Sequence, residues 1–288
     1  MEIKMERKVK ICADSTCDLS DELIMKYDIG IVPLCIVLNE KSYFDKEELT
    51  PEDIFRWSDE NRTTPKTSAV TIERTMEIIK PFMDADMDVV FLGISEDMST
   101  TCNVLRLVAN EFERGRVFAV DSMNLSTGIG LQVIRAAQMA EEGKTAEEIV
   151  SAIECARPDV RASFVVDTLT YLARGGRCSG VTALLANTLK LHPRIEVKDG
   201  KMIVGTKYRG KINKVLLKYT KDMEESLKKA DPARVFITHS GVDPEVVEEI
   251  REYLRGLDHF EEIIETRAGG VISSHCGPGT LGVLFYQK

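Results

Sequence analysis

The sequence lacks any apolar run near the ~20 residues that a membrane-spanning helix needs. Its first eight residues are rich in charge, so we expect no signal peptide. It also lacks an excess of basic residues, because the net charge is −9 at pH 7. A nucleic-acid-binding protein needs a basic surface to neutralise phosphates. We therefore expect a cytoplasmic protein with no transmembrane segment and no nucleic-acid partner.

Motifs for metals and nucleotides are also missing. The seven cysteines are odd in number, and none forms a CxxC pair, so neither a disulfide framework nor a zinc site is expected. Gly128-Ile129-Gly130 lacks the third glycine of the dinucleotide fingerprint, and no Walker A motif occurs. We predict no metal site and no cofactor.

Buried strand patterns, polar loops and helical patterns alternate along the 288 residues. In residues 1–158 this alternation predicts an N-terminal Rossmann-like α/β domain with a parallel sheet. Residues 159–288 include a hairpin pattern through Asp199-Gly200 and predict a C-terminal α/β domain with a mixed sheet. The predicted fold class is therefore α/β with two domains, divided near Pro158-Asp159.

Four local predictions bear on the site. Residues 29–38 have a strand pattern that Pro33 makes irregular or edge-like. Residues 61–68 are expected to form a polar loop. Residues 211–229 predict one long amphipathic helix. The Gly- and Ser-rich segment 273–280 is expected to be an extended loop.

Segments rich in Ser, Thr and Gly recur beside the predicted strands and helices. Hydroxyls and free backbone N–H groups at helix starts bind carboxylates or phosphates without a lysine. The alternative is that each hydroxyl only caps its helix. The candidate ligand-binding residues in these segments are Ser15, Thr16, Thr67, Ser68, Ser99, Ser126 and Gly128.

His275 next to Cys276 is compatible with a cysteine nucleophile, but adjacent side chains in an extended loop point in different directions. His275 could instead donate a hydrogen bond to a ligand or serve a structural role. A local basic group in the second half is either a solvated face or a docking surface. It comprises Arg174, Arg177, Lys207, Arg209 and Lys211.

Motifs in order along nearly the whole chain resemble the DegV family. Asp14 to Leu19 resembles its DSTxDL opening, and Thr67-Ser68 resembles its TSxPS loop. Residues 95–103 resemble SSxLSGTYN, and 121–130 resemble DS…SxGxG. Residues 167–177 resemble DTLxYLxxGGR, and 275–279 resemble HxGPG.

This resemblance implies two DegV-like α/β domains that hold a long-chain, palmitate-like fatty acid. Its carboxylate would contact Thr67 and Ser99, with His275 nearby. Similar proteins are the fatty-acid-binding subunits of bacterial fatty acid kinase, which implies an ATP-dependent kinase partner that docks on Arg177 and Arg209. The protein itself would then not be an enzyme, and the alternative is a hydrolase that uses Cys276 or Ser99.

The sequence departs from the family motifs at two places. The segment from Thr67 to Thr71 lacks the proline of TSxPS, and Thr100 replaces the glycine of SGT. Without that glycine, we expect either a narrower approach to the head group or a changed head-group preference.

Overall fold

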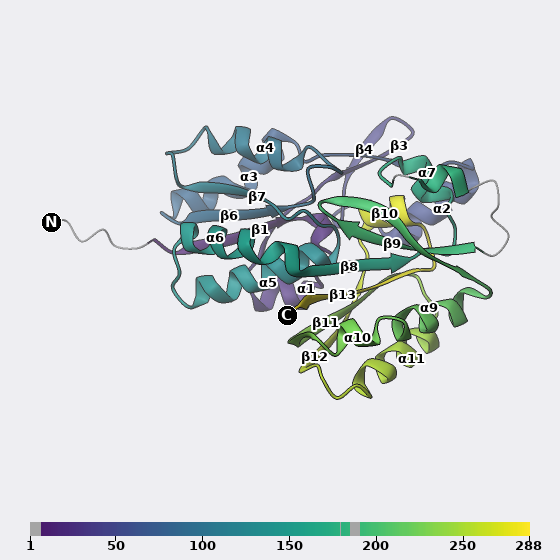
Figure 1. Cartoon of the computed structure of the whole chain (residues 1–288). Coiled ribbons are helices and arrows are strands. Elements are labelled where there is room, and N and C mark those ends of the chain that lie inside the picture. The colour runs from purple at the N-terminus through teal and green to yellow at the C-terminus, as the bar shows by residue number, and fades with distance from the viewer. Residues whose placement is uncertain (1–6, 179, 185–190) are drawn as a thin grey trace.

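The computed structural model describes residues 7–178, 180–184 and 191–288 (Figure 1). The N-terminal half forms a parallel four-stranded sheet in the order β2-β1-β6-β7. Its strands are β1 (Val9–Asp14), β2 (Gly30–Val32), β6 (Asp88–Gly93) and β7 (Val117–Asp121). In Figure 1, α3 and α4 lie on one face of this sheet and α5 and α6 on the other.

The C-terminal half forms a six-stranded mixed sheet in the order β10-β9-β8-β13-β11-β12. Its strands are β8 (Val160–Val165), β9 (Leu191–Lys198), β10 (Lys201–Arg209), β11 (Ala230–Ser240), β12 (Glu262–Arg267) and β13 (Thr280–Gln287). The β9–β10 hairpin turns at Asp199-Gly200 as predicted, with Lys201 opposite Lys198. The parallel and mixed sheets confirm the α/β fold class. The division at residue 158 stays a prediction.

Pro33 changes the path of the chain. The expected strand over residues 29–38 splits into β2 and β3 (Cys35–Leu38), which belong to different sheets. Pro33 has no N–H to donate to a sheet, so the chain can leave one sheet and enter another there. β3 pairs with β4 (Lys41–Phe44) and with β5 (Lys66–Ser68). The expected loop over residues 61–68 therefore ends in a strand, which is too short to have a sequence pattern of its own.

Helices connect and cover the strands. They are α1 (Asp21–Lys26), α2 (Pro51–Asn61), α3 (Ile72–Asp84), α4 (Thr101–Ala109), α5 (Thr127–Glu141), α6 (Ala146–Ala156), α7 (Thr170–Gly175), α8 (Val181–Leu184), α9 (Ile212–Lys221), α10 (Glu224–Leu227), α11 (Pro244–Arg255) and α12 (Gly270–Cys276), with 3₁₀ turns η1 (Ser15–Cys17) and η2 (Arg157–Asp159). The long helix expected over residues 211–229 is interrupted between α9 and α10. There Asp222 caps α9 and the buried Met223 begins the next turn.

α12 corrects the expectation of an extended loop over residues 273–280. The segment ends a short helix because its serines bond back to its own turns. Ser274 Oγ donates to the carbonyl oxygen of Gly270 at 2.7 Å, and Gly277 N donates to that of Ser273 at 2.9 Å. Residues that are typical of loops therefore form a helix here.

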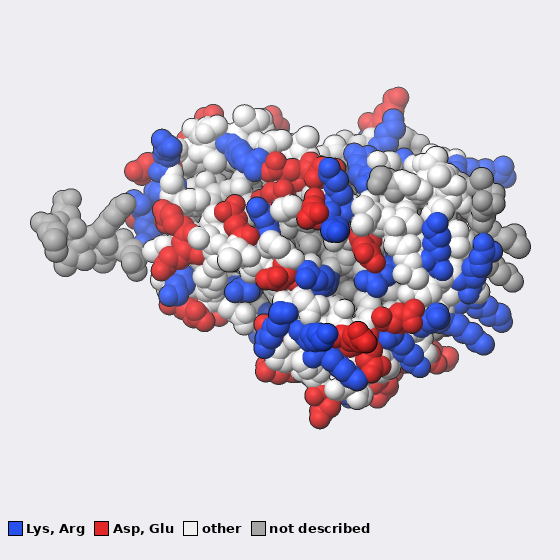
Figure 2. Space-filling model, in the orientation of Figure 1, with Lys and Arg blue, Asp and Glu red and all other residues white. Residues whose placement is uncertain are grey.

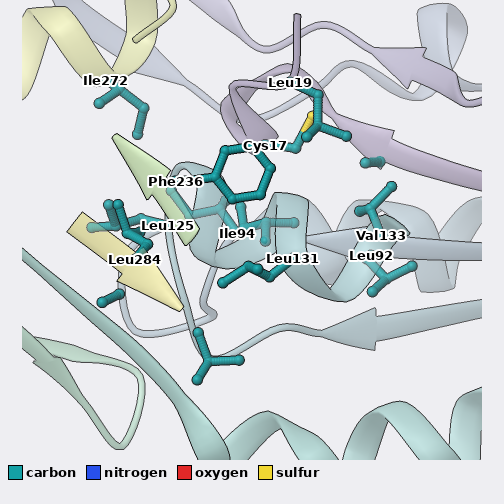
Figure 3. Close-up of a cluster of buried hydrophobic side chains, with 14 of the residues drawn as sticks. Cys17, Leu19, Leu92, Ile94, Leu125, Leu131, Val133, Phe236, Ile272 and Leu284 are labelled. Atoms are coloured by element: carbon teal, nitrogen blue, oxygen red, sulfur yellow. The ribbon is translucent and has the colours of Figure 1, made fainter. Parts of the chain in front are cut away.

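One hydrophobic core joins the two sheets. It includes Leu92 of β6, Leu131 of α5, Phe236 of β11 and Ile272 of α12, all buried (Figure 3). α5 contacts β1 and β6 of one sheet and β8 and β13 of the other. The two halves are therefore packed on a shared helix. Within the described part of the chain, no helix has the length and apolarity needed to cross a membrane.

Candidate functional site

A cavity of about 400 Å³ lies where the N-terminal loops meet α12. Five residues predicted from sequence line it: Thr67, Ser68, Ser99, Arg177 and His275. Apolar side chains complete much of the wall, including Leu34, Ile94, Met98, Met202, Val271 and Ile272. The structure thus brings together hydroxyls, one imidazole and one guanidinium beside an apolar surface.

A hydrogen bond between Thr67 and His275 joins the two halves of the chain at this cavity. Thr67 Oγ1 lies 2.8 Å from His275 Nε2. Thr67 is on β5, where it pairs with Ile36 of β3, and His275 is in the last turn of α12. The residues are 208 positions apart, so only the tertiary fold makes them neighbours.

His275 is neutral near pH 7. Burial, with Arg177 as a second cause, lowers its pKa to about 4. Among the described residues its Nδ1 has no hydrogen-bond partner, and it faces Gly175, where an added Cβ would lie 2.4 Å away. A buried unpaired N–H costs more than an unpaired lone pair beside a carbon. This assigns the proton to Nε2, so His275 donates to Thr67 and leaves the Thr67 hydroxyl hydrogen free.

Ser99 lies at the start of α4, half-buried in the cavity wall. Its Oγ is 2.9 Å from Thr101 Oγ1, and Thr101 N donates to it at 3.4 Å. Thr100, which replaces the family's glycine, has a φ of −87° and also lines the cavity. Because this φ is negative, the position does not require a glycine.

Ser15, Thr16 and Ser126 are turned onto buried carboxylates. Ser15 Oγ donates to Asp45 at 2.8 Å, Ser126 Oγ donates to Asp18 at 2.6 Å, and the Thr16 hydroxyl donates to Asp14. None of these three residues is among the described residues that line the 400 Å³ cavity. Their expected contact with a ligand head group does not follow from the structure, because each hydroxyl already serves a buried acid.

Gly128 is likewise absent from the described lining of this cavity. A Cβ at this position would lie 2.0 Å from Asn124 Oδ1. The glycine therefore gives room for the Asn124 side chain against the first turn of α5. In the structure, Gly128 therefore contributes to packing.

Sequence reasoning missed the three acids that receive these hydroxyls. Burial raises the pKa of Asp14 to about 6 and of Asp18 to about 7, and it raises that of Asp45. Asp14 also accepts from Ile94 N at 2.7 Å, where the loop that carries Ser99 begins. The signal was present in the sequence, since Asp14 and Asp18 flank the hydroxyls of the opening motif.

A second, narrow cavity of about 30 Å³ adjoins the first. The two share Leu125, Ile272 and Cys276 in their walls. Its remaining lining mixes apolar residues, such as Phe164 and Leu284 of the six-stranded sheet, with the polar residues Ser126, Thr238, His239, Ser240 and Thr280. The polar mouth is therefore continuous with the shared core shown in Figure 3.

Neither nucleophile of the hydrolase alternative has an activating partner among the described residues. Burial raises the pKa of the Cys276 thiol well above its ordinary value, so it stays protonated. The Nε2 of His275 bonds Thr67, and Ser99 bonds the hydroxyl of Thr101. Among the described residues, Cys276 is therefore not a thiolate and Ser99 is not paired with a base, as such chemistry at these two residues would need.

Arg177 and Arg209 are both exposed, and Arg177 also lines the cavity. Figure 2 shows Lys and Arg mixed with Asp and Glu over much of this face, with Lys and Arg more frequent toward its right-hand end. Within the described ranges, no cluster of His, Cys, Asp or Glu is arranged to hold a metal ion.

The fold and the site together define an α/β protein with a parallel sheet, a mixed sheet and a small three-stranded sheet, and with a small-ligand cavity between its halves. The chain belongs to the DegV family, which it matches over residues 8–288. It is 31% identical to a fatty acid-binding protein of Thermotoga maritima, with 96% of each chain covered. These matches confirm the resemblance read from the motifs.

Solved structures agree. A DegV family protein from Thermus thermophilus, described by its fatty acid binding, superposes with a TM-score of 0.86 at 33% identity, covering 98% of this chain and 100% of that one. A stearic acid-binding protein from Eubacterium ventriosum superposes with a TM-score of 0.84 at 28% identity, covering 97% and 98%. Relatives of this chain therefore bind fatty acids.

Proposed function

We propose that this protein binds a long-chain fatty acid and has no turnover of its own. The observation that carries the proposal is the Thr67–His275 hydrogen bond at the mouth of an apolar cavity. His275 donates from Nε2, so the Thr67 hydroxyl can donate its hydrogen to a carboxylate. Ser99 supplies a second hydroxyl on the same cavity wall.

Neutral donors suit this head group. Hydrogen bonds to an ionised carboxylate are among the stronger ones in proteins, about 1.5–3 kcal/mol each. The neutral His275 adds no charge of its own, and Arg177 provides a cation at the rim. A carboxylate is thus held by oriented dipoles while its chain enters apolar surroundings.

The acyl chain would follow the junction at Leu125, Ile272 and Cys276 into the narrow cavity. That cavity has about the volume one water occupies in the liquid, so side chains must move to admit a chain. Each buried methylene contributes ~0.8 kcal/mol, which over a palmitate-like chain exceeds ten kcal/mol before binding costs. Burial on this scale favours slow release and presentation to a partner.

The first test is extraction of the purified protein with organic solvent, followed by mass spectrometry. A long-chain fatty acid should be recovered, or added palmitate should be retained. The variant Thr67→Ala/Ser99→Ala should release palmitate about 100-fold faster, because two bonds to a carboxylate are lost. Thr63→Ala is the matched control, since it removes an exposed hydroxyl from the same loop. Protein that is empty and ignores palmitate would refute the proposal.

We also propose that the bound acid is presented to an ATP-dependent fatty acid kinase, with Arg177 and Arg209 on the docking face. Their exposure and positive charge support this role. Arg209→Glu should abolish acyl phosphate formation with such a kinase while palmitate retention stays at the wild-type level. Arg209→Lys is the matched control that keeps the charge. Equal acyl phosphate formation by Arg209→Glu and wild type would count against this docking face.

A further inference from the structure

Two aspartates in the N-terminal half hold the first turn of α12 in the C-terminal half. Asp18 Oδ1 accepts from Gly269 N at 2.8 Å, and Asp45 Oδ1 accepts from Gly270 N at 2.8 Å. Backbone N–H groups at a helix start have no partner within the helix, so they need an external acceptor. Both aspartates are buried, and the bonds span 251 and 225 residues.

The second oxygen of each carboxylate is fixed as well. Asp18 Oδ2 accepts from Ser126 Oγ at 2.6 Å, and Asp45 Oδ2 accepts from Ser15 Oγ at 2.8 Å. Ser15 Oγ in turn accepts from Leu34 N at 3.2 Å. Since both oxygens are engaged, neither carboxylate can rotate freely, and the bonds to α12 have a defined direction.

Close packing limits any shift of this helix start. A Cβ at Gly270 would lie 2.6 Å from Ile36 Cδ1 and 2.8 Å from both Ile54 Cδ1 and Asp45 Oδ1. The backbone of α12 therefore lies directly against β3 and α2. Only a glycine lets the carboxylate and the two isoleucines approach the backbone this closely.

The other end of α12 carries the site. His275 and Cys276 line the cavity from its last turn, with Val271 and Ile272 before them. Thr67 is held by its strand pairing to Ile36, the residue that packs on Gly270. A displacement of α12 by about 1 Å would take the 2.8 Å contact between Thr67 and His275 beyond hydrogen-bond range.

We propose that Asp18 and Asp45 are positioning residues, which fix α12 so that His275 reaches Thr67 and orients its hydroxyl. The inference rests on the proposed function for its consequence in ligand binding, but its structural part stands on the hydrogen bonds alone. It also assigns a purpose to Ser15 and Ser126, which hold the two carboxylates.

The test follows His275 by ¹⁵N NMR in protein freed of lipid, with wild type beside Asp18→Ala and Asp45→Ala. Wild type should show the Nε2–H tautomer with slow exchange of that proton. The alanine variants should exchange it at least about tenfold faster and release palmitate about tenfold faster, a change that corresponds to ~1.4 kcal/mol. Asp18→Asn and Asp45→Asn keep an acceptor oxygen and should restore the wild-type signature.

Leu254→Ala is the control for a loss of stability alone, because Leu254 is buried in α11 in a different core cluster. It should lower the melting temperature and leave the His275 signature unchanged. If an alanine variant does not fold, Asp45→Glu moves the carboxylate by one methylene and should disturb the same signal.

Folded alanine variants with the wild-type His275 signature would overturn the positioning role. Such a result with normal palmitate retention leaves the proposed function intact. Wild-type protein that binds no palmitate refutes the proposed function, while the NMR comparison still decides the positioning role.

Discussion

Hydroxyls at the N-terminal loops fall into two groups that the sequence does not distinguish. Ser15 and Ser126 lie beside Asp45 and Asp18 and donate to them in the interior. Thr67 and Ser99 have no carboxylate partner among the described residues, and they line the cavity. A hydroxyl remains available to a ligand only where the protein itself does not supply a buried acceptor.

The contrast also explains why both groups are needed. The inward hydroxyls, those of Ser15 and Ser126, stabilise the acids that hold α12. This helix carries His275, which orients the hydroxyl of Thr67 in the outward group, Thr67 and Ser99.

The largest expected effect is on unfolding stability and comes from the protonation of Asp18, the acid that Ser126 bonds. Burial raises the pKa of Asp18 from 3.8 to about 7, so the folded protein holds that proton more tightly than the unfolded chain. The stabilising contribution is complete below pH 3.8 and is lost as the pH rises through 7. Asp18→Asn should remove this loss, which is on the order of 4 kcal/mol, relative to wild type.

Chemical denaturation at several pH values measures this pH-dependent loss of stability. The unfolding free energy of Asp18→Asn minus that of wild type should increase between pH 4 and 8. Glu60→Gln, at an exposed position on α2, is the control and should give a flat difference. A flat difference for Asp18→Asn would mean that this carboxylate is not held in a buried, protonation-sensitive state.

Ser15→Ala and Ser68→Ala compare a serine that bonds a buried carboxylate with an exposed serine of the cavity lining. Ser15→Ala removes the donor to Asp45 Oδ2 and the acceptor of Leu34 N, which should cost about 1–3 kcal/mol of unfolding free energy. Ser68 is exposed, so Ser68→Ala should stay within about 0.5 kcal/mol of wild type. Urea denaturation measures both, and equal losses would contradict the division into two groups.

Gly175→Ala tests whether the position of His275 matters for Thr67 and the ligand. An added Cβ would lie 2.4 Å from His275 Nδ1, so the ring must shift from the position in which Nε2 bonds Thr67. The overpacking should cost about 1–2 kcal/mol, and palmitate should dissociate faster. Gly256→Ala is the control, because Gly256 caps α11 away from the cavity and has an ordinary φ of −66°. Gly143 is unsuitable as a control, since its φ of +80° would add backbone strain to an alanine. Unchanged palmitate release by Gly175→Ala would argue against a role of His275.

The smallest effect is expected at Thr100. Thr100→Gly restores the glycine of the family motif, but Thr100 already has an ordinary φ and forms no side-chain cap. Glycine and threonine are nearly equivalent at a helix N-cap, so unfolding stability should change by less than about 0.5 kcal/mol. Calorimetry and palmitate release measure the outcome. Markedly tighter retention would show that the threonine side chain restricts the head group.

Most elements of the fold could be predicted because their patterns are local. The cap at Thr50 followed by Pro51 marked α2, and both sides of its capping box form. The turn at Asp199-Gly200 fixed the β9–β10 register. The three-residue strand β5 and the helix α12 could not be predicted, because both depend on distant segments. β5 pairs with β3, and Asp18 and Asp45 bond the start of α12 in addition to its own serine bonds.

Local sequence patterns are enough to predict the alternation of strands and helices, the family and the hydroxyl-rich loops from which the site is built. The tertiary structure alone decided which hydroxyls turn inward. Asp45 meets Ser15, and His275 meets Thr67, only after segments 30 and 208 residues apart come together. The reason is physical: a hydroxyl bonds to the acceptor nearest in space, and chain folding places that acceptor.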